Sequence, residues 1–111
     1  MFIQNFVQNE VVELKDQISA DGGQIVSKSL VQREDMTLTL FAFAAGESIS
    51  THSSTGDAMV VVLEGEAELT VGGVAKRAKE GQSIIMPANI PHAVQAITDY
   101  KMLLIVVKPQ E

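Results

Sequence analysis

The sequence predicts an all-β domain built as a sandwich or barrel of short antiparallel strands. From Gln24 onward, about eight or nine β-rich runs are separated by turn signals, roughly every eight to twelve residues. No helix of ordinary length fits after Gly23, which disfavours α/β folds. Apolar residues make up 46% of the chain and charged residues 20%, which is typical of a globular protein.

The first twenty residues are ambiguous. Val7, Val11, Leu14 and Ile18 share one helical face, whereas Val12 and Leu14 also suit a short strand. We expect a short N-terminal strand or helical turn that packs on the outside of the main body. The glycine pair after Asp21 then ends this segment as a turn.

The expected strands are rich in β-branched residues or alternate between apolar and polar positions. Gly72–Gly73 is a two-residue hairpin signal, because glycine reaches positive φ without strain. The segment from Pro87 to Pro91 cannot be a central strand, because proline donates no ladder hydrogen bond. The expected strands are 24–31, 36–43, 58–63, 67–71, 74–78, 83–86, 92–97 and 101–108.

The length of 111 residues favours one domain over residues 1–111, with the barrel core at 36–108. The net charge of −6 makes nucleic acid and anionic membranes improbable partners. The chain has no cysteine, which excludes thiolate chemistry and fits a cytoplasmic location. The first ten residues lack the pattern of a secretory signal, and no apolar run is long enough to span a bilayer.

Two stretches resemble the paired motifs of the cupin superfamily. Gly46 is followed by five residues and then His52, and Gly65 stands where the first motif closes. Gly81, Pro87 and His92 match the second motif. The chain is similar to small single-domain, conserved-barrel cupins with an RmlC-like jelly roll. This resemblance implies a double-stranded β-helix (jelly-roll) barrel, with a site inside it around the two histidines.

The resemblance also implies which positions line the site. Cupins that hold a metal usually use two histidines and a glutamate from the first motif, and one histidine from the second. Here Ser54 occupies the second histidine position and Ala58 the glutamate position, so His52 and His92 are the remaining metal ligands. On this fold they are expected on facing strands. The predicted ligand-binding residues are His52, Ser54, Ala58, Met86 and His92.

Two neutral imidazoles with waters can hold a divalent zinc, nickel, iron or copper ion. A third protein ligand is not evident. Asp57 lies next to the lost glutamate position, but one step along a strand turns a side chain to the opposite face. Met86 could offer a thioether to copper, although methionine is more often core filler. A metal-free site, with a histidine as a general base or simply hydrogen-bonded, also remains open.

Three functions follow. The first is a binding module that holds a small molecule in the barrel. The second is a metal-dependent enzyme with a reduced two-histidine site, which the resemblance allows to be an isomerase, decarboxylase or dioxygenase. The third is a structural or regulatory domain that acts through its surface. We also expect a homodimer, with residues 1–31 at the interface, because open sheets need their edges covered.

Overall fold

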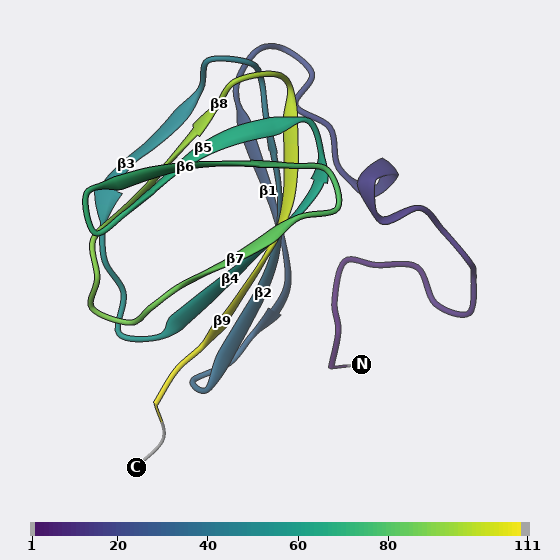
Figure 1. Ribbon diagram of the computed structural model, residues 1–111. Helices are drawn as coiled ribbons and strands as arrows, with labels where there is room; N and C mark the ends of the chain where they lie inside the picture. The colour runs from purple at the N-terminus through teal and green to yellow at the C-terminus, as the bar shows by residue number, and fades with distance from the viewer. Residues whose placement is uncertain (1, 110–111) are drawn as a thin grey trace.

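The computed structural model describes residues 2–109, and these form two antiparallel sheets preceded by an N-terminal arm (Figure 1). One sheet has the strand order β1-β2-β9-β4-β7, and the other has the order β3-β8-β5-β6. The predicted all-β class is confirmed. In the described part of the chain the strands are β1 (Ile25–Gln32), β2 (Met36–Phe43), β3 (Ser48–His52), β4 (Asp57–Glu64), β5 (Glu66–Val71), β6 (Val74–Lys79), β7 (Ser83–Met86), β8 (His92–Ala96) and β9 (Tyr100–Val107).

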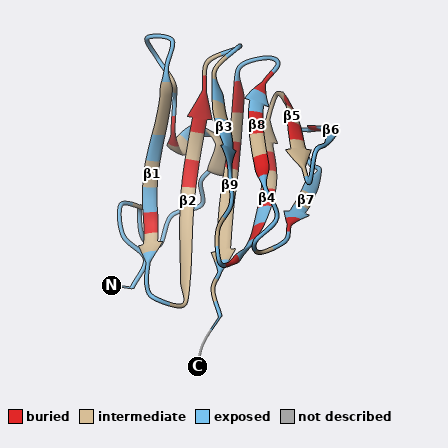
Figure 2. Ribbon diagram, turned by 90° about the vertical axis from the view of Figure 1, so that its left-hand side faces the viewer, coloured by how far each residue is buried: buried red, intermediate tan, exposed pale blue. Residues whose placement is uncertain are grey.

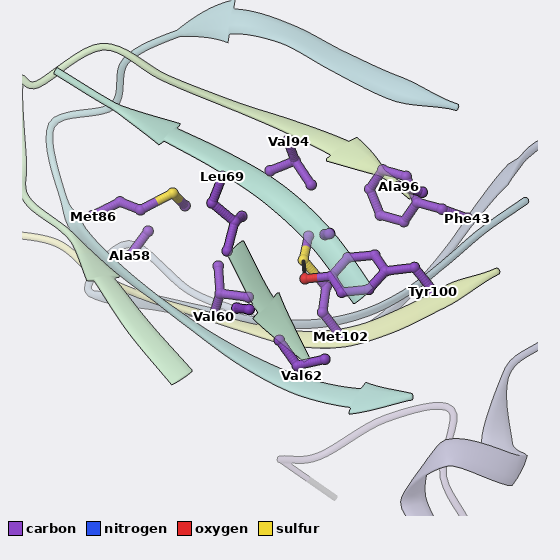
Figure 3. Packing of buried hydrophobic residues seen from close by; sticks show 12 residues of the cluster. Phe43, Ala58, Val60, Val62, Leu69, Met86, Val94, Ala96, Tyr100 and Met102 are labelled. Carbon is purple, nitrogen blue, oxygen red and sulfur yellow. Dashed lines mark hydrogen bonds between the residues drawn. The ribbon is translucent and has the colours of Figure 1, made fainter. Parts of the chain in front are cut away.

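The main core lies between the two sheets. Buried and more exposed positions alternate along β4 and β8, so that each strand presents one face to this space (Figure 2). The middle of the barrel is filled by interdigitating side chains, as Figure 3 shows. The largest fully buried members of this cluster are Phe43, Val60, Val62, Leu69, Met86, Tyr100 and Met102.

A second apolar cluster lies on the outer face of the five-stranded sheet, beneath the N-terminal arm. The arm contains a single 3₁₀ turn, η1 (Leu14–Gln17), and Ile18 is the buried residue that follows it. Ile18 packs with Leu30, Leu40 and Ala42. Nearer the N-terminus, the Gln4 backbone amide donates to the Leu30 carbonyl over 2.7 Å. The arm therefore also covers the free edge of β1.

One strand was not predicted, whereas the helical turn expected in the arm is present. The polar run Ser48–His52 was not predicted to be a strand, yet it forms β3 at the edge of the four-stranded sheet. The helical turn expected on the outside of the main body is confirmed as η1; Leu14 and Ile18 pack against the sheet, whereas Val7 and Val11 are exposed. A four-residue 3₁₀ turn is too short to align all four side chains.

The single-domain boundaries remain a prediction, and residues 1, 110 and 111 of the predicted 1–111 domain lie outside the described part. Between residues 2 and 109, no helix is both long and apolar enough to cross a bilayer.

Candidate functional site

His92 begins β8 and faces the space between the sheets. It alternates with Val94 and Ala96, and all three are buried. The β8–β5 register places His92 opposite Val71 and Val94 opposite Leu69. Since Leu69 is part of the core between the sheets, His92 lies on the same inward face, at one end of the barrel.

His52 ends β3, and a β-bulge turns it toward His92. Ile49 pairs with Val94 and His52 pairs with His92, so three steps along β3 correspond to two steps along β8. Without this extra residue, the odd spacing would place Ile49 and His52 on opposite faces. The bulge therefore lets Ile49 pack against the core while His52 stands directly opposite His92.

The two imidazoles meet through their Nε2 atoms, which are 3.2 Å apart. The ring centroids are 4.3 Å apart and the ring planes are inclined at 68°. His52 and His92 lie on neighbouring hydrogen-bonded strands of one sheet, rather than on facing strands as the sequence suggested. A cross-strand pair brings its side chains closer than strands in opposite sheets would, because neighbouring strands are only about 5 Å apart.

Each ring is oriented by a carbonyl two residues before it. His52 Nδ1 donates to the Ser50 carbonyl over 2.9 Å, and His92 Nδ1 donates to the Ile90 carbonyl over 3.3 Å. A carbonyl only accepts hydrogen bonds, so a neutral ring that keeps its contact carries its proton on Nδ1. Both Nε2 atoms then carry lone pairs, and these lone pairs face each other across 3.2 Å.

The two rings differ in exposure. His92 is 6% exposed, whereas His52 is exposed at the barrel mouth. Burial lowers the pKa of His92 below its ordinary 6.5, and the neighbouring His52 lowers it further, partly offset by the hydrogen bond to Ile90. His92 is therefore kept neutral near pH 7, which is the state in which imidazole binds metal ions.

Two loops form the rim of this end of the barrel and are hydrogen-bonded to each other. The Asn89 backbone amide donates to the Ser54 carbonyl over 2.8 Å. The Ala88 amide donates to Asp57 Oδ1, also over 2.8 Å. Asp57 thus points away from the imidazoles, as its position next to Ala58 indicated, and it holds the loop before His92 in place.

The other predicted ligand-binding residues make structural contacts. Ser54 Oγ donates to the Gly56 carbonyl within its own turn. Ala58 and Met86 are register partners on β4 and β7 and belong to the core cluster between the sheets. Among residues 2–109, no group of three or more His, Cys, Asp or Glu side chains is placed to hold a metal ion. The roles of all five residues remain predictions.

One inward-facing lysine was not predicted from the sequence. Lys76 on β6 pairs with the buried Leu69, so its side chain leaves the strand on the inward face. The sequence does hold a signal for this orientation. The two-residue turn at Gly72–Gly73 fixes the register of the hairpin, and that register pairs Lys76 with Leu69. Lys76 lines a cleft of about 500 Å³ between the edge strands β6 and β7. The residues lining this cleft are Leu69, Lys76, Arg77, Ala78, Gln82, Ser83 and Ile84.

These features define the class of protein: a jelly-roll barrel with a pair of imidazoles at one end. A family model described as "Cupin domain" matches residues 39–108, which is more than half of the chain. The chain therefore belongs to the cupin superfamily, and the predicted fold is confirmed.

Solved structures agree with this assignment. A conserved Streptococcus pyogenes protein of unknown function is 43% identical, with a TM-score of 0.95 over 100% of this chain and 97% of that one. A cupin superfamily protein from Desulfitobacterium hafniense is 30% identical, with a TM-score of 0.92 over 96% and 98%. A cupin 2 conserved barrel domain protein from Leptotrichia buccalis is 46% identical, with a TM-score of 0.83 over 86% of this chain and 46% of that one.

Proposed function

We propose that this cupin is a small-molecule-binding protein, and that its imidazole pair anchors the ligand through one divalent transition metal ion. The observation that carries the proposal is the convergence of the two Nε2 atoms at 3.2 Å, with each Nδ1 atom within hydrogen-bond distance of a backbone carbonyl. Two lone pairs at this distance repel each other unless a cation lies between them. A metal ion or a shared proton would relieve this repulsion.

The geometry fits a metal ion. Zinc binds imidazole nitrogen at about 2.0–2.1 Å, so two ligands at a tetrahedral angle have nitrogens about 3.3 Å apart. The observed 3.2 Å is close to this value. Zinc, nickel, iron and copper all accept imidazole nitrogen, and the two-histidine set does not select among them. A bound ion would supply Lewis acidity toward an oxygen donor of the ligand.

The surroundings of the pair favour binding over turnover. Two protein ligands leave coordination positions that a small oxygen-donor molecule can fill. Asp57, the carboxylate next to the motif's glutamate position, accepts a hydrogen bond from the Ala88 backbone amide and is not directed at the pair. Asp57 is therefore not available as the general base that an isomerase or decarboxylase would be expected to use.

Calorimetric titration of the untagged protein with nickel or zinc tests the proposal. We expect about one ion per chain in the wild type, and a loss of affinity of at least about tenfold in His52→Gln and in His92→Gln. Asp57→Asn is the matched control, because its amide oxygen can still accept from Ala88. If either histidine variant binds as tightly as the wild type, or if Asp57→Asn alone abolishes binding, the two-imidazole site is wrong.

We also propose that the protein is a cytoplasmic homodimer. The outer face of the five-stranded sheet carries an apolar row in which Ile85 pairs with Met59, Met59 with Ile105, and Ile105 with Leu38. Ile85 is 59% exposed, and Phe2 on the arm is 90% exposed. An exposed apolar row is a candidate protein–protein contact surface, and a second copy would cover the row and the arm together.

Light scattering at micromolar concentration tests the dimer. Met59→Glu places a carboxylate in the centre of the apolar row, so we expect the dimer to dissociate. Thr70→Glu is the control, because Thr70 lies on the outer face of the other sheet beside the polar Glu68 and Gln95. A monomeric wild type, or a Met59→Glu variant that stays dimeric, would refute this interface.

A further inference from the structure

The cleft between β6 and β7 is a second site, separate from the imidazole pair. Lys76 shares a cross-strand row with Leu69 and Val94, whereas His92 belongs to the next inward row, with Val71. Lys76 and His92 are also separated by the whole of β5. With strands about 5 Å apart, their backbones are about 10 Å apart across the sheet. Ligand binding in the Lys76 cleft can therefore be measured while the imidazole pair stays empty.

The cleft combines an apolar wall with a polar rim. Leu69, Ala78 and Ile84 come from the faces turned toward the core, and Leu69 is fully buried. Lys76 and Gln82 supply the polar groups. A volume of about 500 Å³ lies within the range of small-molecule sites, about 300–1,000 Å³.

Among residues 2–109, no carboxylate forms an ion pair with the lysine of the cleft. Arg77, the next residue on β6, forms ion pairs with Glu66 at 3.4 Å and Glu68 at 3.6 Å on the outer face. None of the ion pairs within residues 2–109 involves Lys76, although the protein has a net charge of −6. The carboxylates of Glu66 and Glu68 are thus on the neighbouring strand, but they lie on the outer face of the sheet.

We propose that this cleft binds a small amphiphilic carboxylate. The carboxylate pairs with the Lys76 ammonium, and the apolar body lies against the half-buried Ile84, above the buried Leu69 and Ala78. An inward lysine on an edge strand also discourages pairing between copies of the sheet. Protection of the sheet edge needs only the charge of Lys76. A ligand also requires the volume of the cleft and the apolar wall beneath Lys76, and both are present.

The test uses octanoate, with 1-octanol as the uncharged probe, followed by amide chemical shifts in two-dimensional NMR. We expect saturable octanoate shifts at the amides of Leu69, Ala78 and Ile84, and binding of 1-octanol at least about tenfold weaker. Lys76→Gln should weaken octanoate binding by about tenfold or more. Lys79→Gln on the same strand is the matched control and should change binding less than about twofold, because Lys79 lies opposite Glu66 outside the cleft.

Three outcomes would overturn the proposal. The first is equal affinity for octanoate and 1-octanol, and the second is octanoate shifts that fall elsewhere in the protein. The third is unchanged octanoate binding in Lys76→Gln; self-association of that variant would then assign Lys76 to edge protection alone. Failure of metal binding at His52 and His92 would leave the result at this cleft unaffected.

Discussion

The two ends of the space between the sheets are built differently. At one end Phe43 and Tyr100 pack edge to face, with ring centroids 5.4 Å apart, and the Tyr100 hydroxyl donates to the Met102 sulfur. At the other end two imidazoles occupy the corresponding inward positions, and polar loops form the rim. The first end is closed by packing, whereas the second exposes electron-pair donors. This difference places the candidate site at the histidine end.

The closed end should be the more sensitive to added volume. Gly65 has a φ of +77°, and a Cβ there would overlap the backbone carbonyl of Asp99. We expect Gly65→Ala to lower the free energy of unfolding by about 3 kcal/mol or more, from left-handed strain and overpacking together. Chemical denaturation measures this change.

Gly73→Ala is the matched control for that prediction. Gly73 has a similar φ of +82°, but a Cβ there would meet nothing within 4 Å. It should therefore lose only about 1 kcal/mol, from backbone strain alone. Equal losses in the two variants would mean that the closed end is not tightly packed around Gly65.

The contrast between the two ends also shows how much of the fold and of the site could be predicted from the sequence. Apolar runs and glycine turns predicted eight of the strands, because burial and turn chemistry are local signals. β3 was missed, because Ser48–His52 is polar and becomes a strand only through pairing with β8. The bulge that turns His52 inward has no local signal either. The motif spacing therefore indicated which histidines to compare, but not that they are cross-strand neighbours.

Acid should weaken the histidine end before it affects the closed end. Because the pKa of His92 is lowered on folding, the unfolded chain binds a proton near pH 6.5 that the folded protein binds only at lower pH. The contribution of His92 to stability is therefore complete above about pH 6.5, and it is lost as the pH falls through the folded-state pKa.

Urea unfolding in the presence of a chelator measures this dependence. The wild type should lose more stability than His92→Gln between about pH 7.5 and about pH 5.5. Comparison with the variant removes the contribution of carboxylates, which titrate in both proteins. Parallel pH profiles would show that His92 is not buried as a neutral ring.

The smallest effect is expected at the rim. Ser54→Ala removes a hydroxyl that bonds only within its own turn, so we expect a loss of about 0.5–1.5 kcal/mol in stability. Metal affinity in the calorimetric titration should not change. A drop in affinity would instead assign Ser54 to the site, as its place in the motif suggested.

The central claim is that both imidazoles carry their proton on Nδ1 and present a bare Nε2 to each other. Long-range ¹H–¹⁵N correlation spectra of the side chains test this directly, since the chain has 2 histidines and the signals are few. In metal-free protein above the histidine pKa values, both rings should show Nδ1–H, and one equivalent of zinc should shift both Nε2 resonances together. An Nε2–H tautomer in either ring, or a zinc shift confined to one ring, would contradict the account.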